Sequence, residues 1–136
     1  MASAVAARAS DVTLSVSAAV ILWDFAPSNP DGMWSSSDPG KLTVPSGAGG
    51  RYQVTAAIQG NRVGQLKLLK NSTDINSAGI AQATLPSLSG SRNATSLYYV
   101  DSNSQPGDYF VIVYFTTIIP GGPTVYTGSQ FTAKLF

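Results

Sequence analysis

The segment 107–117 has the sequence GDYFVIVYFTT, and it decides which fold we expect. After the Gly-Asp turn, every side chain from Tyr109 to Thr117 is aromatic or β-branched, which predicts a β-strand. Side chains alternate between the two faces of a strand, so both faces of this one are apolar. A strand in a small sandwich needs only one apolar face. We therefore expect another copy of the chain to cover the second face.

The composition is typical of a single all-β domain. The 136 residues are enough for one hydrophobic core. Only 11% of the residues are charged, and all seven acidic residues are Asp. Strong helix formers are scarce, whereas Gly, Ser, Thr, Pro and Asn are abundant. This composition predicts strands and turns rather than helices.

The charge pattern argues against nucleic-acid and membrane partners. The net charge is +1 and the basic residues are scattered, so the basic patch that nucleic acid requires is missing. The apolar runs are too short to span a membrane. The N-terminus lacks the basic and apolar regions of a signal peptide. We therefore expect no nucleic-acid partner, no membrane partner and no signal peptide.

The types of residue present also argue against catalysis. The chain has no Cys and no His, which excludes thiol catalysis, His-based triads and imidazole metal sites. Asp24, Asp31 and Asp38 flank or occupy one loop, where their spacing favours carboxylate-stabilised turns; a calcium site is the alternative. We expect a protein that is not an enzyme, with no catalytic residue, cofactor or metal.

The chain divides into an N-terminal arm, residues 1–11, and one domain, residues 12–136. The arm is rich in Ala and Ser and is predicted to be extended. In the loop 27–40, Met33 and Trp34 are the only large apolar side chains. We expect them to plug the end of the sandwich, with contact at the surface as the alternative.

Alternating apolar residues mark further strands. In 52–59 the apolar side chains fall on one face, and small or polar side chains fall on the other. The segments 64–71, 97–100 and 131–135 are also predicted strands, separated by turn-forming residues. About eight to ten strands with turns at short intervals describe an antiparallel β-sandwich or jelly roll.

Several local motifs occur in an order that is similar to a known family. They are Asp31-Gly32-Met33, Leu42-Thr43-Val44-Pro45 before a Gly-rich turn, Gly50-x-Tyr52-x-Val54, Gly64-x-Leu66-x-Leu68-x-Lys70-Asn71, Gly107-Asp108-Tyr109, and Ser129-x-Phe131-x-Ala133-x-Leu135. Together they resemble the jelly-roll domain shared by tumour necrosis factor and the globular heads of the complement recognition subcomponent. The first two motifs resemble the version in bacteriophage and bacterial proteins. The resemblance covers about residues 18–136.

The resemblance implies a ten-stranded jelly roll that assembles as a parallel homotrimer around an aromatic and aliphatic axis. On this basis the candidates for the trimer interface are Tyr98, Tyr99, Phe110, Ile112, Tyr114 and Phe136. Several of these side chains belong to the protomer core in the alternative interpretation, because the pattern does not say which face of a strand points inward.

The function expected from the resemblance is that of a trimeric bacteriophage capsid decoration protein on the exterior surface of the virion. The N-terminal arm would dock on the major capsid protein or on another virion protein. The alternative is a receptor- or carbohydrate-binding module at a tail-fibre tip. In that case Met33, Trp34 and Tyr126 are the surface-contact candidates, with Trp34 or Tyr126 stacking on sugar rings.

Overall fold

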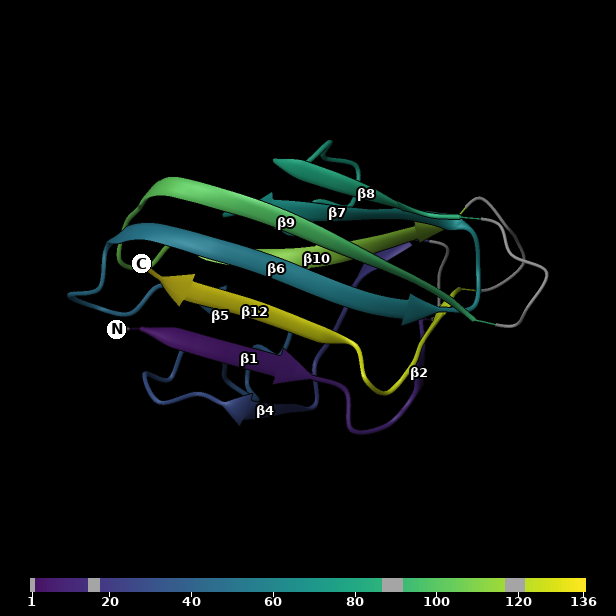
Figure 1. Cartoon of the computed structure of the whole chain (residues 1–136), viewed down its shortest axis with the longest axis horizontal. Helices are drawn as coiled ribbons and strands as arrows, with labels where there is room; N and C mark the ends of the chain where they lie inside the picture. The colour runs from purple at the N-terminus through teal and green to yellow at the C-terminus, as the bar shows by residue number, and fades with distance from the viewer. Residues whose placement is uncertain (1, 15–17, 87–91, 117–121) are drawn as a thin grey trace.

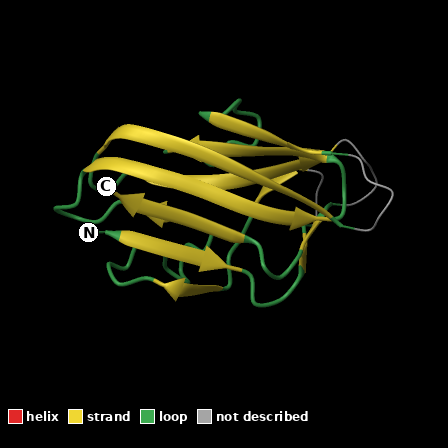
Figure 2. Ribbon diagram, in the orientation of Figure 1, coloured by secondary structure: helices red, strands yellow, loops and turns green. Residues whose placement is uncertain are grey.

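The structure is a computed structural model that describes residues 2–14, 18–86, 92–116 and 122–136. The described residues form strands and loops without a helix (Figures 1 and 2). The larger sheet contains β2 (Val12–Thr13), β11 (Thr124–Val125), β6 (Gly50–Gly60), β12 (Gln130–Leu135), β1 (Ser3–Ala7), β4 (Phe25–Ser28) and β9 (Asn93–Ser104). The smaller sheet contains β3 (Ala18–Val20), β10 (Tyr109–Thr116), β7 (Gly64–Lys70), β8 (Ala81–Leu85) and β5 (Leu42–Thr43).

The two sheets pack face to face, and each strand pairing is antiparallel. This arrangement confirms the predicted all-β sandwich. In the larger sheet, β6 lies between β12 and β9, and β9 pairs with β6 alone among the described strands. In the smaller sheet, β10 lies between β3 and β7. The strand predicted for Tyr109 to Thr117 is therefore an interior strand of its sheet, although Thr117 lies outside the described residues.

The core lies between the sheets and follows the alternation of the sequence. The apolar face predicted for 52–59 points inward, and its four side chains are at most 1% exposed. Trp23 stacks at a tilt on Phe131 of β12, with 5.9 Å between the ring centroids. The larger side chains that the smaller sheet contributes to this core include Leu42, Leu66, Leu68, Leu85, Phe110, Ile112 and Tyr114.

The N-terminal segment is not a separate arm, which corrects the expectation for residues 1–11. Ser3–Ala7 forms β1, which pairs with β12 on one side and with β4 on the other. Ala4 and Ala6 are completely buried in the core. Their small side chains allow β1 to lie close to the opposite sheet. The Ala-rich composition is the same for a buried strand and for an exposed arm, so it did not predict this strand.

The outer face of β10 is covered by the chain itself, which corrects the expectation that another copy covers it. Val111 and Val113 are completely buried in a second, smaller cluster with Leu69 of β7. Ile75, from the loop between β7 and β8, packs against this cluster. Lys67 holds the loop in place, because its Nζ donates hydrogen bonds to the carbonyl oxygens of Ile75 (2.6 Å) and Ser77 (2.8 Å).

Candidate interaction surface

Each of the three acidic residues near the loop 27–40 interacts with a different part of the chain. Asp24 accepts hydrogen bonds from Ala9 and Ser10 and pairs with Arg8 at 3.3 Å. Asp31 accepts a hydrogen bond from the backbone N–H of Ser3, and Asp38 pairs with Lys41 at 2.9 Å. The carboxylates therefore stabilise three different connections. In the described ranges, no group of three or more His, Cys, Asp or Glu side chains is placed to hold a metal ion.

A second charged cluster joins the two sheets. Lys70 Nζ at the end of β7 lies 2.7 Å from Asp101 of β9 and 3.5 Å from Asp108, which precedes β10. Burial disfavours the charge on Asp101, but hydrogen bonds from Lys70 and Ser104 outweigh this and hold its pKa below the usual value. The N–H of Gln105 and the amide of Asn71 lower the pKa of Asp108. This cluster links β7 to β9 and to the turn before β10, and both of its carboxylates have intrachain partners.

The structure separates the interface candidates into two groups. Phe110, Ile112 and Tyr114 are completely buried within one chain, so their assignment to an interface between copies is wrong. The sequence placed them on one apolar face of a strand with two such faces, and alternation does not say which face is the inner one. Tyr99 is half-buried and packs against the same core.

Two interface candidates remain exposed. Tyr98 is 60% exposed on β9, and its hydroxyl makes no hydrogen bond to any described residue. Phe136 is 42% exposed, and the Arg51 guanidinium lies 4.5 Å from the centroid of its ring. Tyr98 therefore offers a free aromatic side chain, whereas one face of Phe136 is already occupied.

The surface-contact candidates are largely engaged within the chain. Met33 is 2% exposed and belongs to the core, so the expectation that it plugs the sandwich is confirmed and its surface role is wrong. Trp34 is half-buried against the core, and its indole N–H donates to the carbonyl oxygen of Pro39 (3.0 Å). Tyr126 is half-buried, with the Arg92 guanidinium 4.0 Å from its ring centroid.

Several described side chains on the outer face of the larger sheet are exposed, namely Ala57, Ala94, Ser96, Tyr98 and Gln130. Strand register places its outward side chains in rows across β1, β12, β6 and β9. One row contains Val5, Thr132, Thr55 and Tyr98; the next contains Gln130, Ala57 and Ser96; the third contains Gln59 and Ala94. These three rows carry no charged side chain, and Tyr98 is their only aromatic residue. We call this surface the neutral face.

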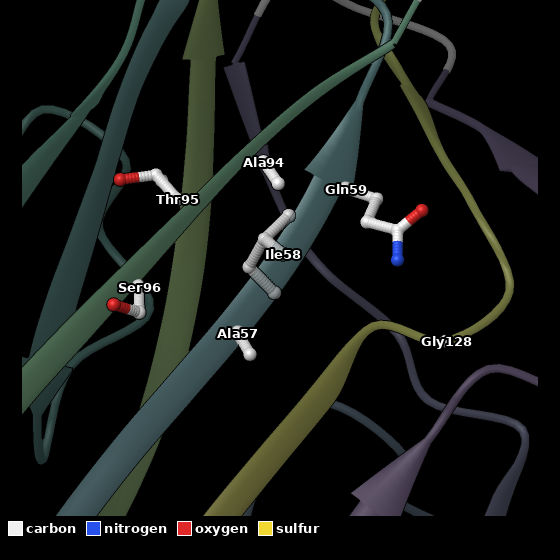
Figure 3. Close-up of a pocket in the computed structure, with 7 residues that line it drawn as sticks. All are labelled: Ala57, Ile58, Gln59, Ala94, Thr95, Ser96 and Gly128. Carbon is white, nitrogen blue, oxygen red and sulfur yellow. The ribbon is translucent and has the colours of Figure 1, made fainter.

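One end of the neutral face is hollowed. The hollow has a volume of about 320 Å³ and is lined by Ala57, Ile58, Gln59, Ala94, Thr95, Ser96 and Gly128. Figure 3 shows residues from β6 and β9 on its walls and Gly128 in the loop before β12. Among the described residues, the side chains of Gln59 and Ser96 have no hydrogen-bond partner, whereas Thr95 is paired with the inward-facing Ile58 and lies on the opposite face of β9 from Ser96. The hollow therefore offers small apolar side chains together with unbonded amide and hydroxyl groups.

The sequence predicted only the part of the neutral face that β6 contributes. The alternation in 52–59 predicted one small and polar face of β6. What the sequence did not indicate is the register that places Ala57 beside Ser96 and Thr55 beside Tyr98. The hollow forms where β6 pairs with β9, and no local sequence motif predicts this long-range pairing.

With this geometry, the fold is defined as a two-sheet jelly roll of the kind found in tumour necrosis factor and complement proteins. Among solved structures, the globular domain of the zebrafish complement 1qA protein matches with a TM-score of 0.64 and 12% sequence identity. The match covers 99% of this chain and 96% of that chain. No protein-family model and no curated protein matches the chain. The similarity therefore establishes the fold.

The described residues also include no helix long and apolar enough to cross a membrane.

Proposed function

We propose that this protein is a non-enzymatic structural protein that works as a homotrimer. Its proposed setting is the exterior surface of a bacteriophage particle, as a capsid decoration protein. The observation that carries self-association is the neutral face, where Tyr98 is 60% exposed in a row of uncharged side chains, with Lys134 in the adjoining row. The virion setting rests on Asp31-Gly32-Met33 and the Leu42–Pro45 motif, which resemble bacteriophage versions of the fold.

Physical reasons support self-association through this face. Outside the hollow, the neutral face carries mainly small Thr, Ala and Ser side chains, so a second protein surface can approach it closely. No ion needs to be desolvated in these three rows, which lie toward the hollow end of the face, and identical copies meet there without repulsion between like charges. Exposed tyrosines are favourable interface anchors, because the ring buries a large apolar area while the hydroxyl forms a hydrogen bond.

The proposed docking partner remains the major capsid protein or another virion protein, but the docking surface changes. Ser3–Ala7 is fixed between β12 and β4 and is not available as a free arm. Docking therefore uses a surface of the folded domain. The two chain ends lie at the same end of the sandwich (Figure 1), and the Leu135 N–H donates to the carbonyl oxygen of Ala2 (2.8 Å).

Two measurements test this proposal. Sedimentation equilibrium of the purified chain at micromolar concentration should give three times the monomer mass. Electron microscopy of purified particles should place the trimers at regular sites on the capsid. A stable monomer would refute the proposed trimer, and absence of the protein from purified particles would refute the virion setting.

A second candidate function is a carbohydrate- or receptor-binding module at a tail-fibre tip. The observation in its favour is the hollow of the neutral face, where Gln59 and Ser96 have unbonded polar groups. Glycan-array binding by the wild-type protein tests this candidate. Trp34 and Tyr126 are weaker candidates for sugar binding than the sequence suggested. The indole N–H of Trp34 donates to the Pro39 carbonyl oxygen, and the Arg92 guanidinium lies over the Tyr126 ring.

A further inference from the structure

We propose that the larger sheet binds an acidic segment of a virion protein at the end of the sandwich where β1 begins and β12 ends (Figure 1). The site is formed by Arg51, Lys134 and Phe136, and we call it the cationic end. This inference rests on the proposed docking to a virion protein. It specifies the docking surface and the chemistry of the partner.

Strand pairing places the two cations next to each other. Lys134 of β12 lies opposite Gln53 of β6, and the N–H of Phe136 donates to the carbonyl oxygen of Arg51 (2.9 Å). Arg51 and Lys134 are therefore diagonal neighbours on adjacent strands, where such residues stand about 7–8 Å apart and long side chains can meet. Both side chains are exposed, so one bound group can contact both of them.

Neither cation has an anionic partner within the described part of the chain. Arg51 and Lys134 form no ion pair and donate no side-chain hydrogen bond to a described residue. The other basic residues that face a carboxylate, Arg8, Lys41 and Lys70, each pair with an Asp. The cationic end therefore has two positive charges that no intrachain carboxylate neutralises.

The acidic residues near the cationic end are engaged elsewhere. Asp31 accepts a hydrogen bond from the N–H of Ser3, at the start of β1. Asp101 of β9 is buried and pairs with Lys70 between the sheets. Because both carboxylates already have partners, an anionic group that reaches Arg51 and Lys134 has to come from another molecule.

An exposed aromatic ring completes the surface. Phe136 is 42% exposed, and the Arg51 guanidinium lies 4.5 Å from the centroid of its ring. A guanidinium that stacks on a ring still presents N–H groups to a carboxylate, and it can bind both carboxylate oxygens at once. Lys134 supplies a second, compact charge. The uncovered part of the Phe136 ring offers a contact for an apolar side chain next to the carboxylate.

Charge favours an acidic protein segment as the occupant. If the cationic end of one copy met that of another, like charges would oppose each other, which disfavours self-contact here. Nucleic acid binds to longer basic tracts that neutralise many phosphates, and two cations do not form such a tract. A short segment with two carboxylates and one apolar side chain matches the two cations and the ring.

A peptide titration tests the chemistry of the site. The probe is the acetylated and amidated tripeptide Asp-Leu-Glu, which is added to the ¹⁵N-labelled full chain and followed by amide chemical shifts. The shifts should be largest at Arg51, Lys134 and Phe136. They should decrease with added salt, because salt screens exposed charges. The neutral tripeptide Asn-Leu-Gln is the control and should cause no comparable shifts.

A matched pair of variants tests the contribution of the charge. Arg51→Gln should weaken binding of the acidic tripeptide about two- to fivefold, because one exposed charge contact is lost. Arg92→Gln is the control, because the Arg92 guanidinium also lies over a ring, that of Tyr126, at the other end of the sandwich. It removes the same charge and the same type of ring contact, and it should leave the affinity unchanged.

Retention on purified particles tests the role of the surface in docking. A trimer carries three cationic ends, so Arg51→Gln should lower retention by about tenfold or more, a larger loss than for a single tripeptide. Lys134→Gln should act in the same direction. Both variants should remain trimeric in sedimentation and folded by circular dichroism, because both positions are exposed.

The outcomes separate this inference from the proposed function. If the wild-type protein binds particles and Arg51→Gln is retained equally well, the inference is overturned and the proposed function stands. The same holds if the neutral tripeptide binds as well as the acidic one, if Arg92→Gln has the same effect as Arg51→Gln, or if a DNA oligonucleotide binds the surface more tightly than the tripeptide at physiological salt. A wild-type protein that is absent from particles overturns both.

Discussion

Lys70 Nζ lies 2.7 Å from Asp101 Oδ2, and this ion pair joins the end of β7 in the smaller sheet to β9 in the larger sheet. The two side chains are 23% and 12% exposed, so water screens the pair only partly. Lys70 also lies 3.5 Å from Asp108. The cluster therefore fixes the spacing of the sheets at the end of the sandwich opposite the hollow.

Replacing this lysine should destabilise the fold. Lys70→Met leaves Asp101 with a hydrogen bond from Ser104 but without its cation, and should lower the free energy of unfolding by about 1–3 kcal/mol. Asp38→Asn is the matched control, because Asp38 is 58% exposed, its pair with Lys41 contributes little, and Lys41 keeps its contact with the Tyr109 ring. Urea denaturation measures both. Equal losses for the two variants would show that burial of the Lys70 pair does not matter.

Stability should fall in acid and again in strong alkali. The pKa values of Asp24, Asp101 and Asp108 are lowered in the folded protein, so their contribution is present above the unfolded pKa of about 4 and is lost as the pH falls through the lower folded values. The pKa of Lys70 is raised, because Asp101 and Asp108 outweigh the effect of burial. Its contribution is lost as the pH rises above about 10.4.

Between these limits the chain has no His to titrate, so the urea midpoint should be nearly constant from about pH 5 to 9. Asp24→Asn should show a shallower loss in acid than the wild type. A wild-type midpoint that stays constant down to pH 2.5 would contradict the assigned pKa directions.

The N-terminal strand offers a test with two adjacent residues. Ala6 points into the core and is completely buried, whereas Val5 points toward the neutral face. Ala6→Leu should lower the free energy of unfolding by about 1–3 kcal/mol, because the core has no space for three more carbons. Val5→Leu should change it by less than about 0.5 kcal/mol. If both changes were neutral in thermal unfolding, residues 3–7 would not form the strand described.

The intrachain cover of β10 is also testable. Lys67→Met removes the hydrogen bonds to the Ile75 and Ser77 carbonyls and should cost about 1–2 kcal/mol in urea denaturation. Amide hydrogen exchange in the β7–β8 loop should become faster, because the loop is no longer tied to β7. Gln65→Met, on the same face of β7 but exposed, is the control. Unchanged exchange in the Lys67 variant would contradict the role of this lysine.

Local pattern determined a large part of the fold. Alternating apolar residues in 52–59 and the aromatic and β-branched run of 107–117 define β6 and β10, and the Pro/Gly-rich loop places Met33 at the end of the core. These features depend on side-chain periodicity and turn chemistry, which are local. They were enough to predict a two-sheet jelly roll without helices.

Only the tertiary structure determined which strand faces are buried and which are exposed. Both faces of β10 are apolar, and only packing shows that Phe110 faces the other sheet while Val111 lies under the β7–β8 loop. Likewise, only pairing with β12 and β4 makes β1 a strand rather than an arm. The register between β6 and β9 sets Tyr98 beside the hollow. Each of these depends on contacts between residues far apart in the chain, and the hydrophobic pattern of a single segment does not specify them.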